Sequence, residues 1–146
     1  MAKDQSSVVD ARGDRVTTML RERALGAMAR AYAPYSSFRV GAALLATDGS
    51  ITEGCNVENA SYPAGICAER GAVAAAVARG NRDFDSITIA TEAEEPTPPC
   101  GICRQVLEEF SPKMLVIAVT RDGKEGRWTL EDLLPKAFTP HSLDRR

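Results

Sequence analysis

The sequence predicts an α/β fold with three layers (α/β/α), in which helices cover both faces of a mixed sheet of about five strands. The first observation is the order of the patterns: a helix, two strands joined by a tight turn, and then helices and strands in alternation. The second is an uninterrupted apolar stretch at 114–120, of the kind that forms a strand buried on both faces. The third is that 146 residues fit one domain, with no internal repeat and no sign of a second domain.

The chain begins with a polar, aperiodic stretch at 1–13, which predicts a flexible lead-in. A helix is expected from Asp14, a plausible N-cap, because apolar residues then recur at helical spacing. This helix should end before Pro34, since a residue that precedes proline disfavours helical geometry. We expect a single domain over 14–140, followed by a C-terminal tail at 141–146.

Five stretches have the apolar or β-branched composition of strands: 40–46, 51–58, 86–91, 114–120 and 126–128. Asp48-Gly49, between the first two, is a strong signal for a two-residue hairpin. Helices are expected at 65–79, at 101–110 and after the capping-box pattern at 129–132. A hairpin followed by alternating helices and strands indicates a mixed sheet with helices on both faces.

Composition and charge argue against several classes of function. Hydrophobic residues make up 44% of the chain and charged residues 26%, which is typical of a soluble globular protein. No apolar run approaches the ~20 residues that cross a bilayer, and the first residues lack the apolar core of a signal peptide. We therefore expect a cytoplasmic protein whose four cysteines bind metal or stay free rather than form disulfides. A formal net charge of −2 without a basic cluster argues against a nucleic-acid partner.

Three of the four cysteines lie in two short stretches, Cys67-Ala68-Glu69-Arg70 and Pro99-Cys100-Gly101-Ile102-Cys103. Both stretches follow helix-breaking residues and lead into helical patterns, so each places cysteine at a helix N-terminus. Free backbone N–H groups and the helix dipole lower the pKa of a thiol there and favour the metal-binding thiolate. Cys100 and Cys103 share a face of the first turn, and with Cys67 they can hold zinc at three corners of a tetrahedron. The fourth corner stays open to water, as in catalytic zinc sites.

Glu69 lies two residues after Cys67, close enough to reach a metal-bound water without being a ligand. A zinc ligand, one residue, Glu and then Pro-Cys-x-x-Cys is the pattern of zinc deaminases, in which the Glu is the general acid and base. The single histidine, His141, lies near the C-terminus and has no expected role. A carboxylate is therefore the expected proton shuttle.

Two other interpretations of the cysteines stay open. A Cys-x-x-Cys motif in a cytoplasmic protein can be a redox pair, although this leaves Cys67 and Glu69 without a use. A closed structural zinc site would take Cys55 as its fourth ligand, although such a site has no need of Glu69.

Five segments, in order, resemble the small zinc-dependent cytidine deaminases that act on free nucleosides: YSSFRVGAAL (35–44), GCNVENASY (54–62), CAER (67–70), PCGICRQV (99–106) and LLPKAF (133–138). The zinc motif alone also fits deaminases of nucleotides and nucleic acids, and the segment 56–59 narrows the resemblance to nucleosides. The resemblance implies a cytidine deaminase-like fold and a homotetramer in which several chains build each pocket.

The resemblance also implies which residues bind the substrate. In an extended strand Asn56 and Glu58 project to the same face, where an amide and a carboxylate suit a ribose diol. A polar face turned to solvent is the alternative, but the matching family positions hold the sugar. Phe38 matches an aromatic residue that packs against the pyrimidine, although a phenylalanine by itself is more often a core residue. Tyr62 and Phe138 match positions that reach into a neighbouring subunit's site, and an ordinary packing role is the equal alternative for both.

Two further roles follow from the resemblance. The backbone N–H of Ala68 matches a group that helps to orient the base. Arg70 matches a residue that hydrogen-bonds the thiolates, and its positive charge would offset the net negative charge of a zinc ion held by three thiolates.

The expected function is the zinc-dependent hydrolytic deamination of cytidine and 2′-deoxycytidine to uridine and 2′-deoxyuridine, with release of ammonia, as in pyrimidine salvage. One zinc ion is expected per chain. Two alternatives stay open: a deaminase of a related aminopyrimidine nucleoside antibiotic, and a non-catalytic module stabilised by zinc.

Overall fold

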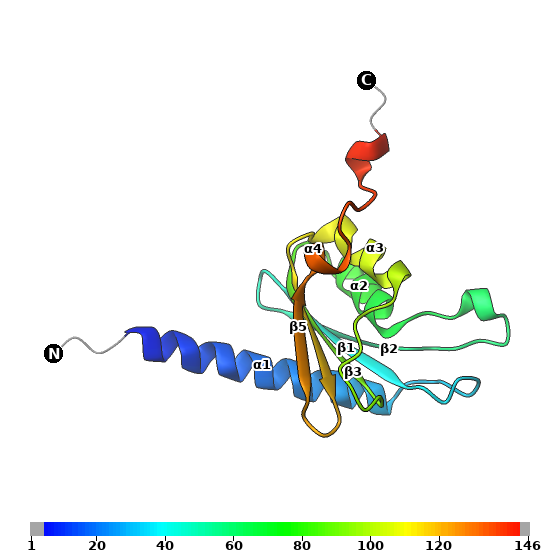
Figure 1. The fold of residues 1–146 in the computed structure, drawn as a ribbon, viewed down its shortest axis with the longest axis horizontal. Helices are drawn as coiled ribbons and strands as arrows, with labels where there is room; N and C mark the ends of the chain where they lie inside the picture. Colours follow the sequence, from blue (N-terminus) through cyan, green and yellow to red (C-terminus); the bar gives the residue numbers. More distant parts are fainter. Residues whose placement is uncertain (1–4, 144–146) are drawn as a thin grey trace.

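A five-stranded sheet forms the centre of the computed structural model, which describes residues 5–143 (Figure 1). Its strands lie in the order β2-β1-β3-β4-β5. In chain order they are β1 (Val40–Ala46), β2 (Ile51–Cys55), β3 (Phe84–Thr91), β4 (Leu115–Thr120) and β5 (Glu125–Thr129). β3 and β4 run parallel, whereas the other neighbouring pairs are antiparallel. The predicted mixed sheet of about five strands is therefore confirmed.

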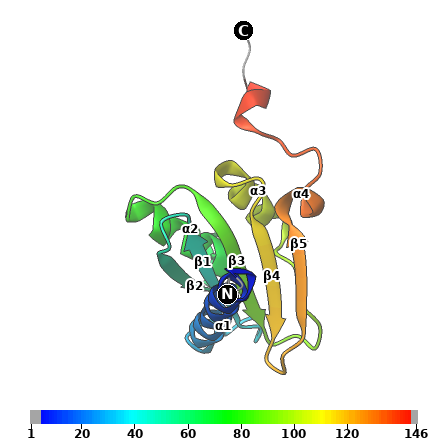
Figure 2. The same ribbon diagram turned by 90° about the vertical axis from the view of Figure 1, so that its left-hand side faces the viewer.

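Helices cover both faces of this sheet (Figure 2). They are α1 (Gln5–Ala29), α2 (Ala68–Ala78), α3 (Gly101–Phe110) and the single turn α4 (Leu130–Leu133), with 3₁₀ turns at Tyr62–Ala64 and Pro140–Leu143. One apolar core lies between α1 and the sheet, where Leu20 and Met28 pack on Ala43 and Val119. The other lies on the opposite face, under α2, α3 and α4. The three-layer arrangement follows from alternate strand residues facing opposite cores.

Helix α1 begins at Gln5 rather than at the predicted Asp14, so the segment 5–13, predicted as a lead-in, continues the helix. That segment contains no proline and includes good helix formers such as Ala11 and Arg12, so the helix propagates without an apolar stripe. The N-terminal part of α1 extends beyond the sheet (Figure 1). Residues 1–4 of the lead-in and 144–146 of the tail lie outside the described residues.

Most other boundaries agree with the sequence, and two differ near the predicted site. The helix at 101–110 and the capping box between Thr129 and Asp132 are confirmed. β2 ends at Cys55 instead of residue 58, and α2 begins at Ala68 instead of residue 65. The reason is a two-way backbone pairing between Val57 and Ile66, which keeps both segments extended until the chain reaches α2.

Two glycines allow helices to approach the sheet closely. A methyl group at Gly41 would overlap the backbone of α1, and one at Gly54 would overlap the Ala68 carbonyl oxygen and the Ala72 amide nitrogen of α2. The first turn of α2 therefore packs directly against β2, which fixes the height of its N-terminus above the sheet. None of the helices between residues 5 and 143 combines the length and the apolar composition that a membrane crossing requires.

Candidate metal centre and nucleoside cavity

The N-termini of α2 and α3 meet and bring three thiols together. Cys67 is the N-cap of α2 and Cys100 is the N-cap of α3, both with extended backbone. Neither side chain caps its own helix, which leaves both sulfur atoms available to a neighbour. Cys103 follows in the first turn of α3 and is fully buried. Two segments far apart in the sequence thus supply one thiol cluster.

The spacing of this cluster fits a zinc ion. The three Sγ atoms all lie within 4.8 Å of one another, and those of Cys67 and Cys100 are 3.9 Å apart. A tetrahedral site with Zn–S bonds of ~2.3 Å has S···S separations of roughly 3.8 Å. Within the described part of the chain, the group consists of these three cysteines. The fourth cysteine, Cys55, is half-buried on β2 and does not belong to it. Three thiolates leave one zinc position open, as in a catalytic rather than a structural site.

The surroundings favour thiolate at Cys67, whereas the hydrogen bond with Cys67 and then burial raise the pKa of the Cys103 thiol. The neighbouring Cys103 thiol, together with the Arg70 guanidinium and Cys100, lowers the pKa of Cys67 to about 5 against the opposing effect of burial. Arg70 Nη2 lies 3.8 Å from the Cys67 Sγ and 3.4 Å from the Gly65 carbonyl oxygen. Its buried Nε has no hydrogen-bond partner among the described residues. Arg70 is therefore placed to compensate negative charge on the sulfur atoms.

Glu69 is the second residue of α2 and is only 5% exposed. Burial is the main reason why the pKa of its carboxyl group is raised above the usual range, and the charge of Cys67 adds to the effect. The carboxyl group shares a cavity with Cys67 and Cys100. A buried carboxyl group whose pKa is raised is suited to proton transfer beside the thiol cluster.

The cavity at this cluster has a volume of about 480 Å³, within the range of pockets that bind small molecules. Its lining comes from the segment before β1, the chain on either side of the Val57–Ile66 pairing, the end of β3 and the approach to α3: Ser36, Phe38, Val40, Asn56, Val57, Glu58, Tyr62, Gly65, Ile66, Cys67, Ala68, Glu69, Arg70, Ile89, Thr91, Thr97, Pro98 and Cys100. The cavity therefore joins the thiols and Glu69 to most of the predicted substrate-binding residues.

Asn56 and Glu58 both line the cavity although β2 has ended before them. Asn56 donates to the Phe38 carbonyl oxygen at 2.8 Å and accepts from the Val40 N–H at 2.8 Å. One oxygen of Glu58, Oε1, accepts from the backbone N–H groups of Tyr35 and Ser36 at 2.9 and 3.1 Å. The hydrogen bonds from Ser36, and then that from Tyr35, lower the pKa of Glu58. The carboxylate is thus charged at neutral pH.

Of the remaining predicted residues, three line the cavity and Phe138 does not. Phe38 is 37% exposed and lines the cavity, as does the buried Ala68. Tyr62 is 75% exposed, lies at the cavity and packs edge-to-face on Tyr35, with ring centroids 5.8 Å apart. Phe138 is 58% exposed and is not among the residues that line the cavity of its own chain. It lies on the C-terminal segment, which leads away from the sheet (Figure 1).

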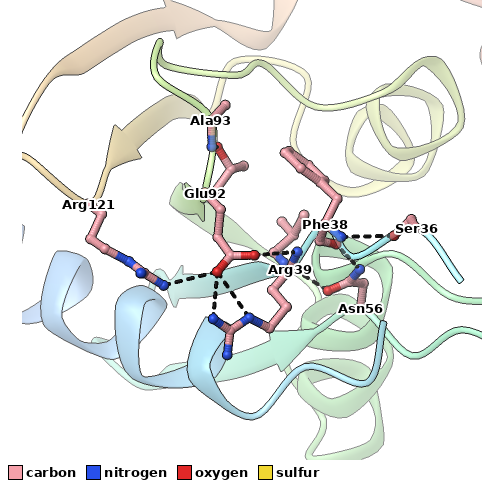
Figure 3. Close-up of polar contacts among 9 residues, drawn as sticks. Ser36, Phe38, Arg39, Asn56, Glu92, Ala93 and Arg121 are labelled. Atoms are coloured by element: carbon pink, nitrogen blue, oxygen red, sulfur yellow. Dashed lines mark hydrogen bonds and ion pairs between the residues drawn. The ribbon is translucent and has the colours of Figure 1, made fainter. Parts of the chain in front are cut away.

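Sequence reasoning missed several residues around the cavity. Thr91, Thr97 and Pro98 line it from the end of β3 and from the segment before Cys100. The run of prolines before Cys100 marked that segment as a loop but gave no sign that it faces a ligand. A second omission is an ion-pair network in which Glu92 joins Arg39 to Arg121 (Figure 3).

Comparison with known proteins agrees with this geometry. The family model described as cytidine and deoxycytidylate deaminase zinc-binding region matches residues 15–119. A cytidine deaminase of Halalkalibacterium halodurans is 43% identical over 127 residues, which cover 86% of this chain and 96% of that protein. A crystal structure of cytidine deaminase from Burkholderia pseudomallei has a TM-score of 0.80 and 46% identity, covering 83% of this chain and 98% of that one.

A more distant relative is named for a different substrate. A blasticidin-S deaminase of Bacillus cereus is 31% identical over 108 residues, covering 68% of this chain and 76% of that protein. The family model spans the region from within α1 to the end of β4, including the three thiols and Glu69. The chain therefore belongs to the cytidine and deoxycytidylate deaminase family.

Proposed function

We propose that the protein is a cytidine deaminase that converts cytidine and 2′-deoxycytidine to uridine and 2′-deoxyuridine with release of ammonia, as in pyrimidine salvage. The observation that carries the proposal is one cavity of nucleoside size lined by two thiols of the cluster, Cys67 and Cys100, and by the buried Glu69. The 43% identity to a cytidine deaminase over most of both chains supports the choice of substrate.

Cys67, Cys100 and Cys103 would hold one zinc ion per chain, which would supply Lewis acidity to the attacking water. Glu69 moves the protons. Its carboxylate takes one proton from the attacking water and delivers it to the ring nitrogen N3. It then takes the second proton from the hydroxyl group now on C4 and gives it to the leaving amine. Water adds at C4 and ammonia leaves from the same carbon, so the reaction is balanced without a further reactant.

The other predicted residues bind and orient the nucleoside. Asn56 and Glu58 hold the sugar hydroxyls, with the Glu58 carboxylate, one oxygen of which accepts from the Tyr35 and Ser36 N–H groups, as the acceptor for them. Phe38 packs against the pyrimidine ring, and the backbone N–H of Ala68 orients it. Arg70 offsets the negative charge of the thiolates, which its position beside Cys67 supports.

We further propose a homotetramer in which Tyr62 and Phe138 each reach the cavity of a neighbouring chain. Both rings are largely exposed, and that of Phe138 lies away from the cavity of its own chain, which supports this assignment. Light scattering coupled to size exclusion tests the assembly. The four free cysteines support a reducing compartment such as the cytoplasm.

The decisive experiment incubates the zinc-loaded protein with cytidine and follows ultraviolet absorbance and ammonia together. We expect one ammonia molecule for each cytidine consumed, and a parallel metal measurement should find one zinc ion per chain. A zinc-loaded protein that leaves both cytidine and 2′-deoxycytidine unchanged contradicts the proposal.

An antibiotic-directed deaminase is the second candidate, because the blasticidin-S deaminase shares 31% identity. Its chemistry needs the same thiols and the same glutamate, so the two candidates differ only in the substrate pocket. Blasticidin S assayed beside cytidine separates them: we expect kcat/KM to be higher for cytidine, and the reverse order favours the second candidate.

A further inference from the structure

The cavity wall that carries Phe38 is an irregular segment, 35–39, and hydrogen bonds hold its C-terminal end from two sides. On the cavity side Asn56 bonds the Phe38 carbonyl oxygen and the Val40 N–H. On the other side the Glu92 carboxylate accepts from the backbone N–H of Arg39 at 3.2 Å. The same carboxylate accepts from the Arg39 Nε at 3.1 Å and Nη2 at 2.5 Å. In Figure 3 the Phe38 ring and the Arg39 side chain leave the segment in opposite directions.

Glu92 connects this segment to the sheet. It follows Thr91, the last residue of β3, which lines the cavity and pairs with Val40 in antiparallel register. Its carboxylate also accepts from Arg121 Nη2 at 3.0 Å, just beyond the end of β4. The Glu92 side chain is 23% exposed, and hydrogen bonds from Arg39 are the main cause of its lowered pKa. Glu92 is thus an ionised link between the cavity wall and the ends of two central strands.

The segment needs such support. Ser37 has a φ angle of 56°, in the left-handed region that is unfavourable for residues other than glycine. The Phe38 ring is 37% exposed and belongs to neither aromatic pair of the described residues. A strained turn beside an exposed ring keeps one conformation only where its neighbours hold it.

We infer that Glu92 is a positioning residue for the nucleoside: by fixing Arg39 it holds the Phe38 ring where the pyrimidine packs, and so it sets substrate affinity. The inference rests on the proposed function, since it concerns the binding of that substrate. Glu92 is not among the residues that line the cavity, and it acts through Arg39.

The consequence is a separation of KM from kcat. Removing the carboxylate frees the Arg39 backbone N–H and guanidinium, so the segment 35–39 gains alternative conformations and the ordered one is less populated. Loss of hydrogen bonds to a charged group corresponds to about a tenfold rise in KM. Glu69 and the thiols are carried by α2 and α3, so kcat should stay within about threefold.

Glu53 offers a matched control within the same chain. It also bridges two arginines, Arg23 and Arg30, and its side chain is 27% exposed, close to the value for Glu92. It lies on β2 and does not line the cavity. E92A, E92Q, R39A and E53A are therefore compared with the wild type as zinc-loaded full chains, with kcat and KM for cytidine and the inhibition constant of uridine measured for each.

We expect E92A and R39A to raise KM and the uridine inhibition constant about tenfold, and E53A to leave both unchanged. In E92Q an amide oxygen can still accept from the Arg39 N–H, so its KM should rise only about threefold. If E92A fails to fold, E92Q carries the test, and a wild-type KM in that variant overturns the inference.

Three results overturn the positioning role. The first is an equal KM for E92A and E53A. The second is a fall in kcat of E92A as large as the rise in its KM. The third is a loss of zinc from E92A that accounts for the rise in its KM. The proposed function is tested separately by the wild type in the same assay. An inactive wild type overturns both claims, whereas an active wild type with an unaltered E92A overturns only the role of Glu92.

Discussion

At one end of the cavity the side chains come from the first turns of two helices, and at the other end they come from irregular segments. Cys103 and Glu69 are 0% and 5% exposed, and the turn that carries Glu69 packs directly on β2 at Gly54. Phe38 and Tyr62 are 37% and 75% exposed, and side-chain hydrogen bonds from distant residues hold the segment of Phe38. We call the end with the thiols and Glu69 the chemical end, and the end with Phe38 and Tyr62 the recognition end. The chemical end is rigid by packing, and the recognition end is ordered by polar contacts.

This difference has a functional consequence. Proton transfer requires groups within hydrogen-bond reach, which the close packing of α2 on the sheet provides. Sugar and base recognition tolerates small displacements, and its exposed aromatic rings leave room for groups from another chain. Substitutions at the chemical end should therefore act on metal content and kcat, whereas those at the recognition end should act on KM.

The largest effect is expected for loss of a metal-ligating thiol. C100S replaces an exposed thiol by a hydroxyl group, a far weaker zinc ligand at neutral pH, so the variant should lose both zinc and turnover. The matched control is C55S, which alters the cysteine outside the cluster and should keep zinc. Metal analysis per chain and cytidine turnover measure both. Zinc release from C55S would instead indicate a closed four-cysteine site and remove the distinction between the two ends.

The next largest effect is expected for E69Q. Glutamine preserves the shape of the buried side chain but cannot carry the proton, so kcat should fall by about 100-fold or more, with zinc retained and KM changed little. Steady-state kinetics on protein of measured zinc content gives the result. Activity within about tenfold of the wild type would mean that another group moves the protons.

At the chemical end the sequence predicted well where the residues lie, with Cys67 and Cys100 at helix N-termini and Glu69 and Cys103 in first turns, while the proton-transfer role of Glu69 stays a prediction. Cys67, Glu69, Cys100 and Cys103 are local signals, because a helix N-terminus and a spacing of three residues fix their geometry before any tertiary contact forms. The helix at 101–110 forms as predicted for the same reason.

The recognition end was predicted only in part, because its order depends on contacts between distant residues. Arg39 and Glu92 are 53 residues apart in the sequence, and no motif or spacing marks them as partners. The pairing of Val57 with Ile66, which ends β2 early, is likewise a tertiary event. Phe138 was assigned from resemblance alone, because no local pattern in the sequence marks a contact with a neighbouring chain.

A smaller effect, again at the chemical end, is expected for R70Q. Glutamine removes the positive charge beside the Cys67 sulfur, so the thiolates should hold more negative charge and weaken the Lewis acid they bind. We expect kcat to fall about tenfold at unchanged zinc content, with KM close to the wild type. R70K is the informative partner, since it restores the charge without the planar guanidinium and should recover part of the loss. Unaltered rates in R70Q at full zinc occupancy would assign Arg70 a purely structural role.

The smallest effect is expected for E58Q, at the recognition end. The amide oxygen can still accept from Tyr35 and Ser36, but an NH2 donor then replaces the second carboxylate oxygen and cannot accept from a sugar hydroxyl, so KM for cytidine should rise about fivefold with kcat unchanged. 2′,3′-Dideoxycytidine, an analogue that lacks the 2′- and 3′-hydroxyl groups, separates the two tasks of the side chain. If Glu58 binds the sugar, the wild type and E58Q should have similar KM values for this analogue, because neither protein can make the contact with the missing hydroxyl groups. A similar rise in KM for both substrates would show that Glu58 acts by ordering the segment 35–39, which would place it with Glu92 rather than in contact with the ligand.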